Sequence, residues 1–384
     1  MSAGSDPPAH PSLPWRIASS ATMGVSGAIA RAFLFGANRT EVDGLDRFLE
    51  ILDEREDVAG RERGLITVSN HVSVLDDPLI WGILPLSYLF NPDNLRWGLG
   101  AYDICFKNRP LSLFFTLGQV IPTHRYAYSP HGGPFQPSIT QAIRLLSSPP
   151  IQSRPSSPSP SPSSSSPTTD ISDPFSSPTT PYYHPSPTSP PFPSPAYHPS
   201  RRHAWLHIFP EGKVHQHPTH SLRYFKWGIG RLLLEAEPVP RLVPMWIEGL
   251  NDVMHEARRF PRWVPRVANT VHVTIGREVD ADELVGDLRH RWRELVERDR
   301  SGSRVDGDGD GEGGSYASGS LRESAEAQRL RGECARRVRD EVLKLRRARG
   351  WPDEDPKAGS VETWREEGGR REGRMEDGSL VKDV

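Results

Sequence analysis

The sequence predicts a single α/β domain, with a mixed sheet flanked by helices and with a disordered insertion and tail. Short apolar runs alternate with segments of helical period, the order typical of α/β folds. Reactive side chains, among them His71 and Glu211, follow such runs, at the strand ends where α/β sheets collect ligand-binding groups. The 384-residue chain is only 35% hydrophobic and its 38 prolines are unevenly spread. We therefore expect one folded domain of ordinary composition, with disordered segments that lower the average hydrophobic content.

The N-terminal region predicts an unstructured start followed by an apolar segment. The first twenty residues carry Asp6, several prolines and little positive charge, unlike a secretory signal or an arginine-rich transit peptide. Residues 17–36 are mostly small and apolar, and Arg31 interrupts them. Such a stretch is marginal as a spanning helix, so residues 15–40 either lie in a membrane interface or pack on the domain as an amphipathic helix.

The most distinctive motif of the chain lies between a predicted strand and a predicted helix. The β-branched run at residues 64–69 predicts a buried strand. Asp77-Pro78 is typical of a helix start, with aspartate at the cap and proline at the first helical position. His71 therefore lies in a strand-to-helix turn, and the turn lets Asp76 come back to the imidazole.

Further strands and helices are predicted from the same periodicities. The strongly apolar residues 79–90 and 95–106 predict either a core helix and strand or a second membrane-facing surface. The other predicted elements are a strand and helix within 41–53, strands at 119–122, 204–209, 241–247 and 271–275, and helices at 110–118, 224–235 and 281–300.

Composition divides the chain into folded and unfolded parts. Proline and serine nearly alternate from residue 147 to residue 200, and such a segment cannot bury enough apolar surface to offset its ordering entropy. The predicted organisation is a disordered N-terminus (1–14), a membrane-associating segment (15–40), the folded domain (41–146 and 201–300), a disordered insertion (147–200), a Gly/Asp linker (301–320), a charged helix (321–349) and a disordered tail (350–384).

The pair of His71 and Asp76 predicts general-base chemistry. A carboxylate that accepts the proton of one ring nitrogen fixes the tautomer and raises the basicity of the other nitrogen. That nitrogen can take a proton from a hydroxyl as the hydroxyl attacks a carbonyl. The sequence has no Gly-x-Ser-x-Gly elbow and no cysteine near an apt histidine, so direct acyl transfer to a bound alcohol is the simpler mechanism.

Candidate substrate-binding residues follow other predicted strands. In Phe209-Pro210-Glu211-Gly212 the proline ends a strand and the glycine allows a tight turn, so the glutamate can hold a substrate hydroxyl. Guanidinium and ammonium groups bind phosphate, and the basic residues after strand ends are Arg125, Lys213, Arg223 and Lys226. The arginines and aromatics of residues 258–266 fit anionic lipid or nucleic acid, and without a nucleic-acid-binding fold we favour either a lipid surface or no partner.

No metal or cofactor is expected. His215, His217 and His220 lack a fourth ligand, and the acidic repeat of residues 306–311 has alanine where a calcium loop needs glutamate. Gly228-Ile229-Gly230 lacks the third glycine of a dinucleotide fingerprint. With a formal charge of -2, the chain has no overall positive potential that would attract nucleic acid.

The two reactive motifs resemble the paired motifs of the glycerolipid acyltransferase superfamily. Longer strings, at residues 69–78, 79–84, 103–106, 207–214, 225–231 and 249–253, are similar to those of the tafazzin family. The resemblance spans about residues 15–279, apart from the insertion. It implies that His71 is the base, that Asp76 orients it, and that the glycerol-phosphate part is bound by Glu211, Gly212, Lys213 and Lys226.

The middle motif of the superfamily, a glycine followed by an arginine, can be filled by Gly118 and Arg125. Pro122 lies between them, and this spacing departs from the commoner pattern.

The tafazzin family resemblance also implies a function. It implies a membrane-bound transacylase that remodels cardiolipin without coenzyme A, exchanging acyl chains among phosphatidylcholine, cardiolipin and monolysocardiolipin. The implied location is the mitochondrial inner and outer membranes, facing the intermembrane space, with self-association or inner-membrane complexes as possible partners and no nucleic acid. Two alternatives stay open: an acyl-CoA-dependent lysophospholipid acyltransferase, and an inactive membrane-binding scaffold.

Overall fold

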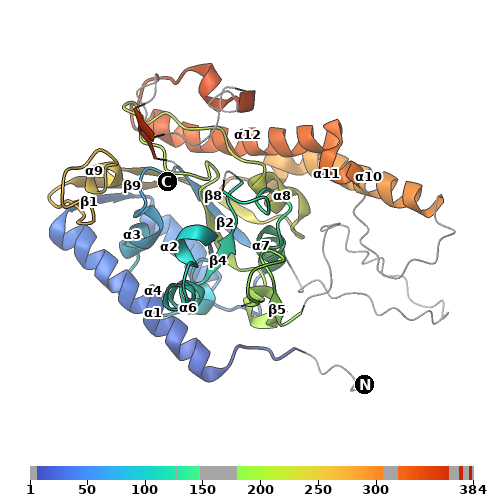
Figure 1. Ribbon diagram of the computed structural model, residues 1–384, viewed down its shortest axis with the longest axis horizontal. Helices are drawn as coiled ribbons and strands as arrows, with labels where there is room; N and C mark the ends of the chain where they lie inside the picture. The colour runs from blue at the N-terminus through green and yellow to red at the C-terminus, as the bar shows by residue number, and fades with distance from the viewer. Residues whose placement is uncertain are drawn as a thin grey trace.

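The computed structural model in Figure 1 describes residues 7–126, 128–147, 180–305, 319–362, 372–374 and 380–382. Several expectations from the sequence lie outside the described residues. They are the disorder expected for residues 1–6, for residues 148–179 of the insertion and for most of the tail beyond 362, and the linker expected at 306–318.

A five-stranded mixed sheet forms the centre of the domain, in the order β1-β9-β8-β2-β7. Its strands are β1 (Arg39–Asp43), β2 (Leu65–Ser69), β7 (Trp205–Ile208), β8 (Arg241–Glu248) and β9 (Thr270–Ile275). β2 runs parallel to both of its neighbours, whereas β8 and β9 are antiparallel. The carboxyl ends of β2, β7 and β8 therefore meet at one edge, and the predicted α/β class with a mixed sheet is confirmed.

Helices cover both faces of the sheet, because strand side chains alternate between two hydrophobic clusters. Ile66 and Val68 of β2 enter one cluster, and Leu65 enters the other. The first cluster also takes side chains from α7 (Pro137–Leu146), α8 (Gly228–Glu235), α10 (Ala281–Val305) and α12 (Ala325–Ala348), and the second from α2 (Leu45–Glu54) and α3 (Asp76–Ile80).

Shorter elements connect these layers. Between β2 and α7 lie η2 (Trp81–Ile83), α4 (Leu86–Leu89), η3 (Pro92–Asn94), β3 (Gly98–Ala101), α5 (Tyr102–Cys105), α6 (Arg109–Leu117) and β4 (Val120–Thr123). β3 and β4 form a separate two-stranded parallel sheet. After β8 come α9 (Leu250–Val253), then α11 (Gly319–Glu323), η6 (Pro356–Gly359) and the strands β10 (Glu372–Arg374) and β11 (Leu380–Lys382).

The N-terminal helix α1 (Leu13–Ala32) lies along the outside of the domain, at the lower left of Figure 1, and η1 (Phe33–Ala37) continues it. Its inward face is made of small residues: Gly24 faces the ring of Phe90, and Gly27 faces Leu89. A side chain at either glycine would collide with these residues, so small residues allow the close approach. The structure therefore packs α1 on the domain, as one of the two alternatives expected.

The outward face of α1 is also apolar. Four side chains spaced four or eight residues apart are more than half exposed: Leu13, Ile17, Val25 and Ile29. Residues 13–37 are also long and apolar enough to cross a membrane, by length and composition. A helix that only packed on a water-soluble domain would be expected to turn polar side chains outward.

The prediction of disorder is wrong for residues 180–200. There β5 (Tyr182–Tyr183) pairs with β6 (Phe192–Pro193), followed by η4 (Pro195–Tyr197) and η5 (Pro199–Arg201). Tyr183 and Phe192 are buried, and Phe192 packs edge-on against Phe106. The aromatic side chains of this stretch supply the apolar area that the preceding Ser/Pro sequence lacks, so it packs on the domain.

The predictions of a separate charged helix at residues 321–349 and of a disordered tail at 350–384 are also wrong in part. α12 packs lengthwise on α8, α10 and β8 rather than standing apart, and Val338 and Val342 are fully buried. Residues 351–362 continue along the domain, and the Trp351 indole donates to the Glu248 carboxylate at 2.6 Å. The helix looks polar in sequence because several of its inward side chains are arginines, Arg331, Arg339 and Arg346.

Candidate active site

His71 and Asp76 meet in the turn between β2 and α3. His71 Nδ1 lies 2.8 Å from Asp76 Oδ2, and the same oxygen accepts the backbone N–H groups of Val72 at 2.6 Å and Ser73 at 2.9 Å. The carboxylate is fully buried, whereas a fifth of the His71 side chain is exposed. Pairing through Nδ1 leaves Nε2 as the ring nitrogen available to a substrate.

The electrostatics of this pair follow from burial. Burial raises the pKa of the Asp76 carboxyl, and the hydrogen bonds from His71, Ser73 and Val72 oppose that rise. Those three donors all favour the ionised form, so a positive charge that develops on the imidazole has a fixed, desolvated carboxylate beside it. The arrangement has the geometry of a histidine general base with its orienting aspartate.

The rest of the first motif holds the turn in place. The Asn70 side-chain amide donates to the Ile247 carbonyl at 2.8 Å and accepts the Ile247 N–H at 2.8 Å, so it extends the pairing of β2 with β8. The His215 N–H donates to the His71 carbonyl at 2.7 Å. Phe209 stacks on the His71 ring with centroids 4.3 Å apart. Both the backbone and the ring of His71 are therefore constrained.

Glu211 braces His71 from the neighbouring strand. Its Oε1 accepts the His71 N–H at 2.7 Å, and its Oε2 accepts the Arg223 N–H at 3.0 Å. The residue is only 2% exposed. The structure therefore turns this carboxylate into the fold, where its visible role is to position His71; its contact with a substrate hydroxyl stays a prediction.

Glu211 gives the protein a pH-dependent stability that a glutamine would lack. Burial raises the pKa of Glu211 to about 7, from 4.5. The folded protein keeps this proton at pH values where the unfolded chain has lost it, so stability falls as pH rises from about 4.5 to about 7. We expect the free energy of unfolding of wild type, measured against that of Glu211→Gln by urea denaturation, to fall across this window. A difference that does not change with pH would contradict the assignment.

The glycine and lysines of the second motif lie beside Glu211. Gly212 has a φ of 68°, and a Cβ there would come within 2.5 Å of Lys226 Nζ, so the lysine side chain crosses the turn. The Lys226 N–H donates to the Pro210 carbonyl at 2.8 Å. Lys213 follows Gly212 and is half-buried. Glu211, Gly212 and Lys226 are thus brought together next to the His71 turn.

Gly118 and Arg125 lie on either side of β4 in the chain, beside the smaller β3–β4 sheet. Gly118 caps the end of α6, as the sequence predicts. Arg125 Nε donates to Asp103 Oδ1 at 3.1 Å, and its guanidinium lies 3.9 Å above the Tyr128 ring. The contacts of Arg125 are therefore with Asp103 and Tyr128 rather than with the His71 turn.

Sequence reasoning missed Arg96, which links the two regions. Arg96 Nη2 donates to Asp77 Oδ2 at 2.7 Å, and Nη1 donates to the Gly118 carbonyl at 3.2 Å. Arg96 is 8% exposed. A buried arginine next to the general-base turn needs partners, and the signal for it was a lone charge inside an apolar run.

The whole chain is similar to several known proteins, although no family model matches it. Tafazzin of Saccharomyces cerevisiae is 34% identical over 359 residues, which is 91% of this chain and 84% of the relative. Tafazzin of Drosophila melanogaster is 27% identical, covering 73% of this chain and 57% of the relative. An N-acylphosphatidylethanolamine synthase of Arabidopsis thaliana is 27% identical, covering 66% and 68%.

Among solved structures, the 1-acyl-sn-glycerophosphate acyltransferase PlsC of Thermotoga maritima is 15% identical with a TM-score of 0.37, covering 76% of this chain and 81% of its own. The sequence relatives carry the assignment. The yeast relative matches nearly the full length, and the expected resemblance is confirmed. The chain belongs to the tafazzin family and is an acyltransferase.

Proposed function

We propose that this protein is a phospholipid–lysophospholipid transacylase that exchanges the acyl chains of cardiolipin and needs no coenzyme A. The observation that carries the chemistry is His71, oriented by Asp76 at 2.8 Å and braced through its backbone by Glu211. Membership of the tafazzin family supports the choice of lipid substrates.

In the proposed reaction the His71 imidazole takes the proton of a lysophospholipid hydroxyl as that oxygen attacks the ester carbonyl of a donor phospholipid. The tetrahedral intermediate then collapses and breaks the bond between the acyl carbon and the donor's glycerol oxygen. The imidazolium returns its proton to that oxygen, which releases a new lysophospholipid. Asp76 stabilises the imidazolium in between.

Direct transfer is supported by the state of the two cysteines and of the serines beside His71 in the chain. Burial raises the pKa of Cys105 to about 11 and that of Cys334 to about 12, so both thiols are protonated at neutral pH. Ser69 and Ser73, which flank His71 in the chain, are fully buried. Each of these residues is a poor site for a covalent acyl group.

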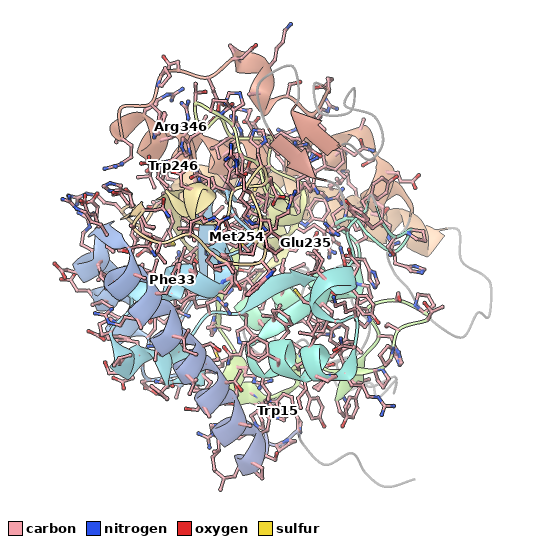
Figure 2. All side chains as sticks on the ribbon, turned by 60° about the vertical axis from the view of Figure 1, so that its left-hand side comes forward. Trp15, Phe33, Glu235, Trp246, Met254 and Arg346 are labelled. Carbon is pink, nitrogen blue, oxygen red and sulfur yellow. The ribbon has the colours of Figure 1, made fainter. Side chains whose placement is uncertain are left out.

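A membrane surface is the proposed source of both lipids. The exposed apolar face of α1 is joined by other exposed apolar side chains on the elements packed against it, Leu86, Phe90, Leu113 and Phe114. Figure 2 shows α1 crossing the front of the molecule from Trp15 to Phe33. Exposed apolar side chains on neighbouring elements are suited to lie in the interface of a bilayer without spanning it.

The loop at residues 254–269 extends this surface beyond the end of α1. The Ala268 N–H donates to the Ala37 carbonyl at 2.8 Å, so the loop adjoins η1. Phe260 is 87% exposed and Trp263 is 76% exposed. The same loop carries arginines 258, 259, 262 and 266, and this combination suits a bilayer with anionic headgroups.

Two charges on the outward face of α1 are expected to abolish membrane binding. Ile17→Asp with Ile29→Asp places carboxylates where apolar side chains now face outward, and each would have to be dehydrated on insertion. We expect the double variant to stay soluble when vesicles containing anionic lipid are sedimented. The control is Ala325→Asp with Ala348→Asp, which adds the same charge to exposed sites on α12. Equal sedimentation of the two variants would contradict the proposed surface.

The substrate proposal is tested with purified protein and acyl-labelled phosphatidylcholine in vesicles, with monolysocardiolipin as acceptor and no coenzyme A. Label is expected in cardiolipin, with lysophosphatidylcholine as the second product. Transfer that starts only after acyl-CoA is added would replace the proposal with an acyl-CoA-dependent acyltransferase, and no transfer in either case would favour an inactive scaffold. Phosphatidylethanolamine added as a rival acceptor tests for an N-acylated product.

Location in mitochondrial membranes that face the intermembrane space is also part of the proposal. It is supported by membership of the tafazzin family. In isolated mitochondria the protein is expected to resist added protease until the outer membrane is opened. Digestion in intact mitochondria would place it on the cytosolic face instead.

A further inference from the structure

Buried arginines on α12 hold the loop that precedes α8. Arg339 Nε donates to the Arg223 carbonyl at 2.8 Å, and Nη2 donates to the Leu222 carbonyl at 2.8 Å. About two helical turns further along α12, Arg346 donates to the carbonyls of His220 at 2.9 Å and Thr219 at 2.8 Å. α12 lies across the top of the molecule in Figure 1, and Figure 2 labels Arg346 there.

Glu354, just after α12, completes the attachment. Its carboxylate pairs with Arg339, and its Oε2 accepts the Leu222 N–H at 3.1 Å. Both side chains of the pair are less than a tenth exposed. Burial of an ion pair costs desolvation energy on both sides, so the pair needs the backbone partners that it has at residues 222 and 223.

The same loop reaches the general base. The peptide group between Leu222 and Arg223 accepts from Arg339 through its carbonyl and donates to Glu211 through its N–H. A peptide group is planar, so its orientation cannot change at one end without changing at the other. Glu211 in turn accepts the His71 N–H at 2.7 Å. Three consecutive contacts therefore connect Arg339 to the backbone of His71.

We propose that Arg339 and Glu354 are positioning residues for the acyl transfer. They hold the backbone of His71 in place through the 222–223 peptide and Glu211. The inference rests on the proposed role of His71 as general base. It gives the C-terminal segment at residues 325–354 a part in catalysis. Loss of the attachment would let Glu211 and the His71 turn shift, and displacements of about 1 Å at reacting groups cost up to about 100-fold in rate.

The test compares two buried arginines of the same helix. Arg339→Gln removes contacts to the 222–223 peptide. The matched control Arg331→Gln removes contacts to the carbonyls of Leu321 and Arg322, which are not part of the loop that precedes α8. Both variants are expected to lower Tm. Arg339→Gln is expected to lower kcat by about 10- to 100-fold with KM nearly unchanged, while Arg331→Gln keeps kcat within about twofold when assayed below its Tm.

A double-mutant cycle separates positioning from a general loss of stability. In the Glu211→Gln background, Arg339→Gln is expected to lower kcat by less than about twofold further, because the route through Glu211 is already weakened. If Arg339→Gln does not fold, Glu354→Gln serves in the same cycle, with an expected loss of about 3- to 10-fold in the wild-type background.

Equal kcat values for the Arg339→Gln and Arg331→Gln variants, or independent losses from Arg339→Gln and Glu211→Gln, would overturn the inference. His71→Ala in the same assay keeps the two proposals apart. If His71→Ala retains full activity, the proposed base is wrong; if it is inactive while Arg339 behaves like Arg331, only the positioning role is wrong.

Discussion

Replacement of His71 with alanine is expected to lower kcat for acyl transfer by about 100- to 10,000-fold, the usual contribution of a general base. The reason is that Nε2 of this ring is the group placed to take the acceptor proton, while Nδ1 is held by Asp76. The measurement is the initial rate of labelled acyl transfer in vesicles, with saturating donor and acceptor. Circular dichroism should show an unchanged fold.

The control for His71 is His290→Ala, which removes a mostly exposed histidine of α10. Its rate is expected to match that of wild type. A His71→Ala rate within about tenfold of wild type would rule out a general-base role of the usual size.

Asp76→Asn is expected to lower kcat as strongly as His71→Ala does, by about 100- to 10,000-fold, while the variant still folds. The asparagine oxygen can still accept from His71 Nδ1, Val72 and Ser73, but it offers no negative charge to the imidazolium. Burial raises the pKa of Asp76, which means that the ionised carboxylate is costly inside the fold. An uncharged asparagine therefore avoids the desolvation cost of the buried carboxylate, but it lowers the rate of catalysis.

The measurement pairs kcat with the free energy of unfolding of the same variant. Asp53→Asn is the control, because Asp53 also accepts a side-chain hydrogen bond, from Tyr88 on the surface. A loss of activity in Asp76→Asn that only accompanied loss of the folded state would contradict the account.

The pairing of His71 with Asp76 could be predicted from the sequence because it is local. Five residues and a strand-to-helix turn suffice to bring the two side chains together, and α3 begins at Asp76 itself. The contact of Glu211 with His71 joins residues 140 positions apart. The sequence predicts that His71 and Glu211 each follow the end of a strand. It does not predict that β2 and β7 are neighbours or that the Glu211 carboxylate turns inward, because both depend on the tertiary fold.

The C-terminal part of the structure was predicted poorly for a physical reason. Buried apolar residues of α12, such as Leu330, Val338 and Val342, do recur at helical spacing. Arginines that bury their stems and donate to backbone carbonyls share the same face, so the high overall charge made α12 look like a solvated helix. The opposite error occurred at residues 180–200, where composition dominated by serine and proline hid the aromatic side chains of Tyr183 and Phe192. In both segments the overall composition, rather than the few apolar side chains that pack, decided the prediction.

Acyl exchange without coenzyme A by wild type and His71→Ala tests the central claim most directly. Purified proteins are given vesicles of acyl-labelled phosphatidylcholine and monolysocardiolipin, with and without acyl-CoA. The account predicts transfer by wild type at the same rate in both conditions, and a rate lower by about 100-fold or more for His71→Ala. Transfer that needs acyl-CoA, or that His71→Ala carries out as fast as wild type, would contradict it.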